Sequence, residues 1–398
     1  MKTVAIYGAL GAVVQRLLTK GFVEARPLLP QVHFVAVDTL DPNTQWEEIA
    51  KRMAKLAFPW NPQLPYASVE QITLNADNSF FLGDKRVVVD GVVVATPTST
   101  HLHIVEQWAT RGALVWVDKP ITLIPEAPHI RQLAAQHPNI FAVDFFLDSD
   151  AMLWFLAQMR ELLGRIGPPT ALHGRLIESW PIEMELGQRW WLLMPEISGG
   201  GAGMDAGVHP LAMFSPILDV LALKLGDVEI TDVVMGGTDP SRTVETAFWC
   251  KGRVGGIELL VDCGKGLEDT CYGITVVGEK GSVEICVGTE EVDPYLRVVD
   301  STGTEVRRFE NGQIGYGHTW LDYLTLLHGG QVSSLSLQQR LDACVGSVEV
   351  VGKAYALHTS LGSQLVHHEV GQPLPVPQKV LGAIAPEVPR SKVRTWAT

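Results

Sequence analysis

The first forty residues place strands, a helix and an acid in the order of a dinucleotide-binding unit. Thr3–Tyr7 is an apolar run that predicts a buried strand, a glycine turn follows at residues 8–11, and Ala12–Lys20 has the apolar spacing of a helix. A second apolar run, His33–Val37, ends in Asp38. In such a unit the pyrophosphate lies at the helix N-terminus and the acid binds the ribose diol. This order predicts a nucleotide-binding domain built on a parallel sheet.

The glycine turn itself departs from the usual pattern. Its sequence is GALG, whereas the pattern GxGxxG would put glycine where this chain has Leu10 and Val13. A purely structural turn therefore remains an alternative. The order of elements is the stronger evidence, and it makes Gly8, Leu10, Gly11 and Asp38 candidate cofactor-binding residues. The charge of Asp38 disfavours a 2′-phosphate and no arginine follows it closely, so we expect NAD, with NADP the less favoured cofactor.

Two further strand–helix units follow in the same half of the chain. Val87–Ala95 is apolar and leads into TPTSTH, and Leu114–Val117 leads into Asp118-Lys119-Pro120. Ligands bind at the carboxyl edge of open parallel sheets, so Lys119 is placed to contact a substrate oxygen. The alternative is an ordinary solvated surface lysine. His101 either contacts cofactor or substrate or only begins its helix, and we interpret residues 39–86 as an insertion at the domain's edge.

Composition excludes several classes of protein. The 398 residues carry a formal charge of −13 with no run of lysine or arginine, which argues against nucleic-acid and anionic-membrane partners. The five cysteines are scattered without metal-ligand spacing, so we expect a cytoplasmic protein with reduced thiols and no metal site. No apolar run reaches about 18 residues. The apolar N-terminus lacks a small-x-small cleavage site, so we do not expect a signal peptide.

The second half of the chain changes in character after Asp148. Asp150–Leu163 has the spacing of an amphipathic helix, and short alternating segments then dominate. These expected strands are Thr170–Ser179, Val228–Met235, Thr246–Lys251, Ile257–Val261, Tyr272–Val277, Ser282–Cys286, Leu296–Val299 and Glu305–Phe309. Helices near residues 318–327 and 337–357 would close this domain. An open sheet leaves one face exposed, so we expect a homodimer or homotetramer formed through Val228–Phe309.

The stretch GGGAGMDAGVH, residues 199–209, places an acid and an imidazole four residues apart. If a helix begins near Met204, Asp205 and His209 project from one face. Glycines allow the backbone to approach something bulky, and a carboxylate beside an imidazole suits a general base. The alternative is a helix cap followed by a single buried histidine.

About ten residues earlier, Arg189, Trp190 and Trp191 supply a donor and an aromatic platform of the kind that covers a sugar's C–H face. We therefore take Arg189 and Trp190, together with His209, as candidate substrate-binding residues. A tryptophan pair in the core is the competing interpretation. Glu178 and Trp180 are weaker candidates at the end of an expected strand.

The motifs VVVATPTSTH, VWVDKPITL and SGGGAGMDAGVH together resemble the glucose–fructose oxidoreductase, inositol dehydrogenase and rhizopine catabolism family from Val4 to about Leu357. The resemblance implies an α/β fold: an N-terminal Rossmann dinucleotide-binding domain (1–147), then an α+β domain with a large, open, mainly antiparallel sheet (148–370). A tail (371–398) would follow. It also implies that the cofactor contacts Thr96, Pro97, Thr98, His101, Asp118 and Lys119, and that Lys119, Asp205 and His209 are catalytic, with aspartate at 118 replacing the family's glutamate.

The implied activity is hydride transfer between a nicotinamide and a hydroxyl or carbonyl carbon of a sugar, polyol or sugar derivative. Removing hydride from a C–OH group needs a base for the hydroxyl proton and a charge that stabilises the alkoxide. His209 would be the base, Lys119 the cation, and Asp205 the group that orients substrate or imidazole. The alternatives are a catalytically silent cofactor-binding regulator and a redox-cycling enzyme with tightly held NAD.

Overall fold

The computed structural model divides the chain into two compact units, Met1–Phe145 with Gly315–Leu341, and Phe146–Ile314 with Asp342–Thr398. Most of the expected helix Ala12–Lys20 and most of the tail from Gly371 lie outside the residues that the structure describes. The described residues are 1–11, 13–14, 21, 25, 27–54, 65–75, 77–82, 84–179, 190–237, 244–267, 270–288, 292–310, 315–332, 334–367, 372, 374 and 393–395.

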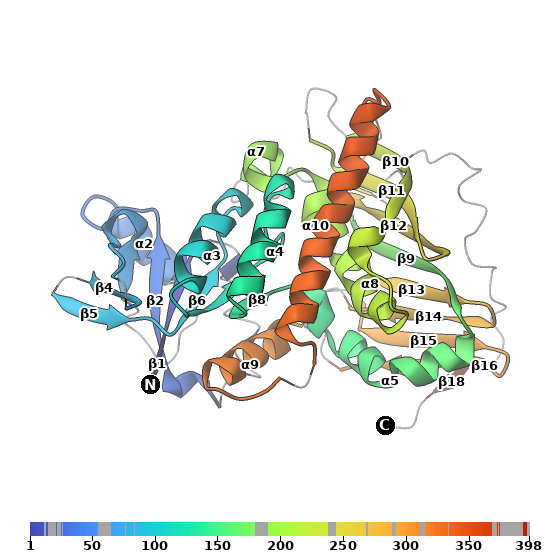
Figure 1. Ribbon diagram of the computed structural model, residues 1–398, viewed down its shortest axis with the longest axis horizontal. Coiled ribbons are helices and arrows are strands. Elements are labelled where there is room, and N and C mark those ends of the chain that lie inside the picture. The colour runs from blue at the N-terminus through green and yellow to red at the C-terminus, as the bar shows by residue number, and fades with distance from the viewer. Residues whose placement is uncertain are drawn as a thin grey trace. The chain divides into compact units, whose positions relative to one another are not determined.

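The first unit is built on a six-stranded sheet in the order β3-β2-β1-β6-β7-β8, and every neighbouring pair is parallel. Strands β1, β2, β6 and β8 of this sheet are labelled in Figure 1. The strands are β1 (Lys2–Tyr7), β2 (Val32–Asp38), β3 (Tyr66–Ser68), β6 (Gly91–Val94), β7 (Leu114–Val117) and β8 (Ile140–Ala142). This is the doubly wound order of dinucleotide-binding folds. The predicted nucleotide-binding sheet is confirmed, and its strands all end at the same edge.

The segment that we interpreted as an insertion supplies part of this sheet. It contains α2 (Trp46–Met53), which leads to the edge strand β3, and then a hairpin of β4 (Ser79–Leu82) and β5 (Lys85–Val88). The helices α3 (His101–Ala109) and α4 (Ala127–Gln136) follow β6 and β7. The described part of residues 39–86 therefore includes an edge strand of the sheet, because Ala36 and Val37 pair with Tyr66 and Ala67, and it also includes β4 and the start of β5.

The helix α9 (Tyr316–Leu327) belongs to the first unit, although the sequence analysis expected it to close the second domain. Trp320 is fully buried, with its ring 4.6 Å from that of Trp116 and 6.2 Å from that of Phe34. The hydroxyl of Tyr323 lies 3.2 Å from the carbonyl of Val92 and 3.1 Å from that of Leu114, to which it donates. Burial of these two aromatic rings joins the segment to the nucleotide-binding sheet.

The second unit contains a ten-stranded sheet in the order β17-β10-β11-β12-β9-β13-β14-β15-β16-β18. It is mainly antiparallel, and the parallel pairs are β9 with β12, β10 with β17 and β16 with β18. Each of the eight predicted strands is present. The strands are β9 (Pro169–Glu178), β10 (Glu229–Gly237), β11 (Ala247–Val254), β12 (Ile257–Lys265), β13 (Cys271–Gly278), β14 (Gly281–Cys286), β15 (Tyr295–Asp300), β16 (Gly303–Arg308), β17 (Val366–His367) and β18 (Val393–Thr395).

Helices pack on this sheet from within the same unit. The helix α5 (Asp150–Ile166) lies against β14 and β15, and α8 (Val208–Val220) lies against β9 and β13. Short α7 (Pro195–Ser198) precedes the glycine run, and α10 (Leu337–Ser360) continues from the first unit into the second. None of the helices that the structure describes is long and apolar enough to cross a membrane.

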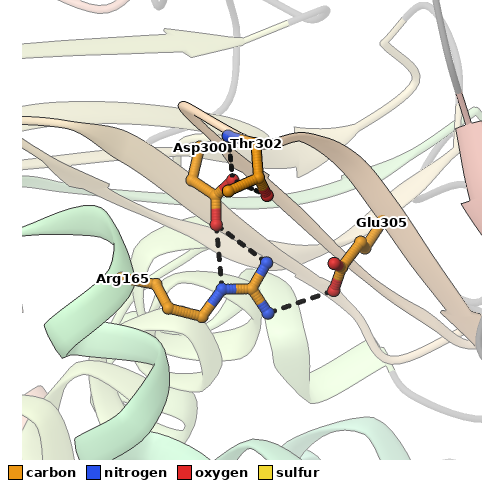
Figure 2. A network of polar contacts seen from close by, with 4 residues as sticks. All are labelled: Arg165, Asp300, Thr302 and Glu305. Carbon is orange, nitrogen blue, oxygen red and sulfur yellow. Dashed lines mark hydrogen bonds and ion pairs between the residues drawn. The ribbon is translucent and has the colours of Figure 1, made fainter.

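A polar network fastens the C-terminal end of α5 to the β15–β16 hairpin (Figure 2). The guanidinium of Arg165 donates to Asp300 at 2.8 Å and to Glu305 at 3.0 Å, and Thr302 donates to Asp300 through its backbone N–H at 2.8 Å. Burial opposes ionisation of Asp300, but the hydrogen bonds from Thr302 and Arg165 outweigh it and lower the pKa of that carboxyl. The network therefore fixes α5 on the sheet by charged, multiply bonded contacts.

Replacing Trp320 by alanine should destabilise the protein by about 3–5 kcal/mol, because it removes a fully buried ring from the first unit's core. Chemical denaturation followed by far-UV circular dichroism would measure the loss. The matched control is Trp46→Ala, whose side chain is 55% exposed and which should change stability by no more than about 0.5 kcal/mol. Equal effects of the two substitutions would show that α9 does not pack on this core.

Candidate active site

The glycine turn lies at the carboxyl edge of the first sheet, against the chain that leaves β6. Gly8 has a φ of +75°, and its N–H donates to the carbonyl of Val37 at 3.0 Å. A Cβ at this position would lie 2.5 Å from the carbonyl oxygen of Ala95. Only glycine satisfies both the backbone angle and this close approach, so Gly8 brings the ends of β1, β2 and β6 together.

Asp38 closes the turn through its carboxylate. One oxygen accepts a hydrogen bond from the N–H of Leu10 at 2.9 Å, and the other accepts from the N–H of Thr39 at 2.8 Å. The N–H of Gly11 donates to the carbonyl of Gly8 at 2.9 Å. The amides of the turn are thus bonded within the chain. The Oδ1 of Asp38 also accepts from the hydroxyl of Thr39 at 3.4 Å, whereas Oδ2 accepts the Leu10 N–H with one of its two lone pairs.

His101 is buried and bridges two strand ends. Its Nδ1 lies 2.9 Å from the carbonyl of Pro120 and its Nε2 lies 2.8 Å from the carbonyl of Thr96. Burial lowers the pKa of His101 despite these two carbonyls, which act in the opposite direction. The geometry supports the structural alternative: the ring ties the turn after β6 to the turn after β7.

The other predicted cofactor residues of this unit lie at the same two turns. Thr96 accepts a hydrogen bond from the hydroxyl of Thr100 at 2.7 Å, and the side chain of Thr98 is buried. Asp118 is also buried, and its N–H donates to the carbonyl of Val94 at 3.0 Å. Lys119 follows at the carboxyl end of β7 and is partly buried. The sheet thus brings Gly8, Asp38, Thr96 and the Lys119 turn to one edge, as the sequence predicts.

In the second unit, the glycine run lies directly on neighbouring backbone and an aromatic ring. A Cβ on Gly201 would lie 2.0 Å from the carbonyl oxygen of Glu245, and a Cβ on Gly200 would lie 2.3 Å from the hydroxyl of Tyr355. The N–H of Ala202 donates to that Glu245 carbonyl at 3.0 Å, and the N–H of Gly203 donates to its carboxylate at 3.0 Å. The groups that the glycines allow to approach closely are therefore the Glu245 backbone and the Tyr355 ring of this same chain.

Glu245 and Tyr355 form a buried pair behind the run. The hydroxyl of Tyr355 donates to the carboxyl of Glu245 and accepts from the N–H of Gly201 at 3.2 Å. Burial raises the pKa of Glu245, and the bonds from Tyr355 and Gly203 only partly oppose that effect. These contacts fix the backbone that leads into Asp205.

The helix that carries the predicted acid and imidazole begins with an irregular turn. Gly203–Gly207 forms one π turn before α8, rather than the regular helical start that we expected near Met204. Such turns are frequent at functional sites. Asp205 and His209 remain four residues apart on one continuous helical segment.

Asp205 belongs to a buried charged cluster that the sequence analysis did not identify. Its carboxylate lies 3.5 Å from the ammonium of Lys265, which also contacts the carboxylate of Glu178. Glu178 in turn accepts a hydrogen bond from the hydroxyl of Tyr272 at 3.0 Å. A small cavity beside this cluster is lined by Leu192, Gly201, Ala202, Asp205, Thr246 and Lys265.

His209 is buried beside aromatic rings. Its imidazole stacks on Phe146 at a centroid distance of 4.3 Å and an interplanar angle of 19°, and Phe146 stacks on Tyr272 at 5.8 Å. The rings fix the imidazole plane, and Tyr272 connects this stack to Glu178. The second unit thus gathers His209, Asp205, Glu178 and Lys265 at one end of its sheet.

The remaining candidates stay predictions. Arg189 and Trp180 lie outside the described residues, and only the backbone of Trp190 is described, in a short helix with Trp191. Among the residues that the structure describes, no group of three or more histidine, cysteine, aspartate or glutamate side chains is arranged to hold a metal ion.

One sequence signal would have identified Lys265. The residues of β12 alternate, with Ile257, Leu259, Val261 and Cys263 buried, and Lys265 continues the same alternation. Because the predicted strand ended at Val261, the lysine fell outside the pattern. Extending the strand by two pleats places Lys265 on the buried face.

The models of two domains of one protein family match successive parts of the chain. "Oxidoreductase family, NAD-binding Rossmann fold" matches residues 62–145, and "Oxidoreductase family, C-terminal alpha/beta domain" matches residues 160–325. The first range contains the Lys119 turn and the second contains the Asp205–His209 segment. The glycine turn and Asp38 precede the first range.

The individual proteins that resemble this chain share a low sequence identity with it. A D-xylose 1-dehydrogenase [NADP(+)] from Haloarcula marismortui is 29% identical over 134 residues, a match that covers 33% of this chain and only 36% of that protein. A levoglucosan dehydrogenase in complex with NADH and levoglucosan has a TM-score of 0.63 at 16% identity, covering 89% of this chain and 97% of the other. An aldose–aldose oxidoreductase from Caulobacter crescentus, complexed with glycerol, has a TM-score of 0.64 at 18% identity, covering 89% and 98%. At these identities the two solved structures establish the fold alone.

Replacing Gly201 by alanine should destabilise the protein by about 1–3 kcal/mol, since the new Cβ meets the Glu245 backbone and the chain must shift. Thermal unfolding would measure the loss. Gly164 is the matched control: it lies within α5 with open space around its Cβ position. Gly164→Ala should be neutral or stabilising by up to about 1 kcal/mol. If both variants were equally stable, the glycine run would not be held by the contacts described above.

Proposed function

The chain belongs to the Gfo/Idh/MocA oxidoreductase family, and from this premise we propose that it transfers hydride between a nicotinamide and a hydroxyl or carbonyl carbon of a sugar, polyol or sugar derivative. The observation that carries the proposal is the match of both family domains in order, one around Lys119 and the other around Asp205 and His209. The names of the relatives, a D-xylose and a levoglucosan dehydrogenase, support a sugar-type substrate. The comparisons favour neither the silent regulator nor the redox-cycling enzyme.

The proposed mechanism assigns one task to each side chain. The nicotinamide, when bound, supplies the hydride acceptor or donor. His209 accepts the hydroxyl proton, and its imidazole plane is set by the stack on Phe146. Lys119 provides the positive charge near the developing alkoxide, and Asp205 orients substrate or imidazole. Lys119 is in the first unit and the other two are in the second, so their meeting at one nicotinamide remains a prediction.

The cofactor site that we propose uses the carboxyl edge of the first sheet. The groups at this edge fit a dinucleotide: the Oδ2 of Asp38 keeps one lone pair that can accept from a ribose hydroxyl, and Val13 and Val14 are helical directly beyond the turn. Because the amides of Gly8–Gly11 are bonded within the chain, we expect the pyrophosphate to be bound by the start of that helix. We propose NAD over NADP on the charge of Asp38, although the named relatives include one NADP-dependent enzyme and one bound to NADH.

Several finer expectations accompany this proposal. Arg189 and Trp190 remain our candidates for contacts with the substrate, together with His209. A homodimer or homotetramer formed through the second unit's sheet, and a cytoplasmic location, also remain predictions.

Replacing His209 by alanine should reduce turnover by about 10²–10⁴-fold, because the variant loses the proton acceptor, while NAD affinity stays unchanged. The variant also loses the stack on Phe146, so its folding is checked by circular dichroism. The assay follows NADH absorbance with a panel of aldoses, polyols and inositols, and calorimetry follows NAD binding. His173→Ala is the matched control, since it removes a partly buried histidine from β9 of the same unit.

Two results would contradict these assignments. Unchanged turnover in His209→Ala would remove the histidine from the mechanism. No NAD(P) reduction and no sugar conversion by the parent protein with any compound would contradict the proposed activity itself. Sugar conversion without free NADH would instead indicate the redox-cycling alternative, which product chromatography would detect.

Replacing Asp38 by asparagine should shift the ratio of NAD to NADP affinity toward NADP by about 10-fold or more, since the negative charge facing a 2′-phosphate is lost. The amide oxygen can still accept the Leu10 N–H, whereas the amide NH2 cannot accept from the Thr39 N–H, so the variant loses one loop hydrogen bond together with the charge. Glu47→Gln on exposed α2 controls for net charge. Fluorescence titration with both dinucleotides measures the ratio, and a ratio unmoved by Asp38→Asn would contradict the assigned role.

A further inference from the structure

Lys265 is a buried lysine at the centre of the charged cluster in the second unit. It ends β12, directly opposite Glu178 on the parallel strand β9. Its side chain is 5% exposed, against 14% for Glu178 and 13% for Asp205. One ammonium therefore faces two mostly buried carboxylates, and its charge stabilises the ionised form of both.

A second ion pair in the same sheet shows what a simple structural contact looks like here. Lys251 on β11 contacts Glu258 on β12 at 2.6 Å, with 15% and 18% side-chain exposure. That contact joins one cation to one carboxylate. Lys265 differs because its second partner, Asp205, lies on the helical segment that also carries His209.

We propose that Lys265 is a positioning residue for Asp205. Its ammonium keeps the Asp205 carboxylate ionised and holds it in its present orientation, and the contact with Glu178 fixes the position of the lysine itself. This inference rests on the proposed function for its catalytic consequence, but not for its electrostatics. Without the cation, two carboxylates would face each other in a mostly buried site, and binding a proton would relieve their repulsion. Protonated Asp205 would no longer present a negative charge to His209 or to a substrate hydroxyl.

The other titratable groups recorded beside the cluster are acids, which are neutral when protonated and negative when they lose a proton. The hydroxyl of Tyr272 supports Glu178, and burial followed by neighbouring acidic groups, Asp205 among them, raises the pKa of Cys263 and keeps that thiol neutral. The acidic groups that act on Cys263 (β12) are, besides Asp205, Asp262 (β12), Cys250 (β11) and Glu245 before β11, and Tyr272 (β13) is the hydroxyl bonded to Glu178.

The test uses Lys265→Met, Lys265→Arg, the double variant Lys265→Met/Glu178→Gln, and Lys251→Met as the matched control. The first measurement is the melting temperature of the full chain between pH 5 and 8, without substrate. In Lys265→Met the folded state binds a proton that the unfolded state has released, so its stability falls relative to the parent as pH rises. We expect its deficit in melting temperature to grow by at least about 2 °C across this range. The deficit should grow less in the double variant, which keeps one carboxylate.

The second measurement is the pH profile of kcat with whichever sugar the panel shows to be turned over. The acidic limb should move upward by about one pH unit in Lys265→Met, return in Lys265→Arg, and stay in place in Lys251→Met. If no sugar is turned over, the proposed function fails and the melting series still decides the role of Lys265.

A pH-independent deficit in Lys265→Met, equal to that of Lys251→Met, would overturn the inference. If Lys265→Met does not fold, the double variant decides, because removing one of the two carboxylates should restore folding. Failure of both variants to fold at every pH would also overturn the inference, since the loss would then not depend on the pair of carboxylates.

Discussion

The direct contact between the glycine run and Glu245 determines the geometry of the second unit's site. No side chain separates the backbone of Gly201 from the carbonyl of Glu245, and hydrogen bonds from Ala202 and Gly203 fix the separation. Asp205 follows within one turn, so its position depends on backbone bonds rather than on a flexible loop. Glu245, the buried acid behind the run, accepts hydrogen bonds from Tyr355 and Gly203, and these offset part of the cost of removing its carboxyl from water.

In the first unit, too, a buried polar side chain bonds to the main chain, and here that side chain is His101. The ring of His101 lies between the carbonyls of Thr96 and Pro120, and thus between the turns that follow β6 and β7. A neutral imidazole has one N–H, so the ring donates to one of these carbonyls in each tautomer and lies beside the other. The turn that carries Lys119 is thereby connected to the turn beside Gly8. In both units, buried polar groups bonded to main chain hold the proposed functional residues on rigid elements.

Much of the fold could be predicted from the sequence because its evidence is local. Alternation identified every strand from β9 to β16, and the order of strand, glycine turn and acid identified the nucleotide-binding sheet. The assignment of α9 was wrong because its partners are remote: Trp320 and Tyr323 reach back to rings and carbonyls some 200 residues earlier in the chain. No periodicity within the helix itself carries that information.

The candidate site was predictable where its residues belong to motifs and unpredictable where strand pairing decides. Gly8, Asp38 and the Lys119 turn lie at one edge because parallel strands end together. Lys265 meets Glu178 only because β12 and β9 pair in parallel with these two residues opposite each other, a register set by strands 87 positions apart. Lysine side chains are ordinarily exposed, so the residue type alone predicts that Lys265 lies at the surface. Only the alternation of buried residues along β12 predicts that it is buried. Local patterns thus locate the chemistry, while long-range register determines which charges surround it.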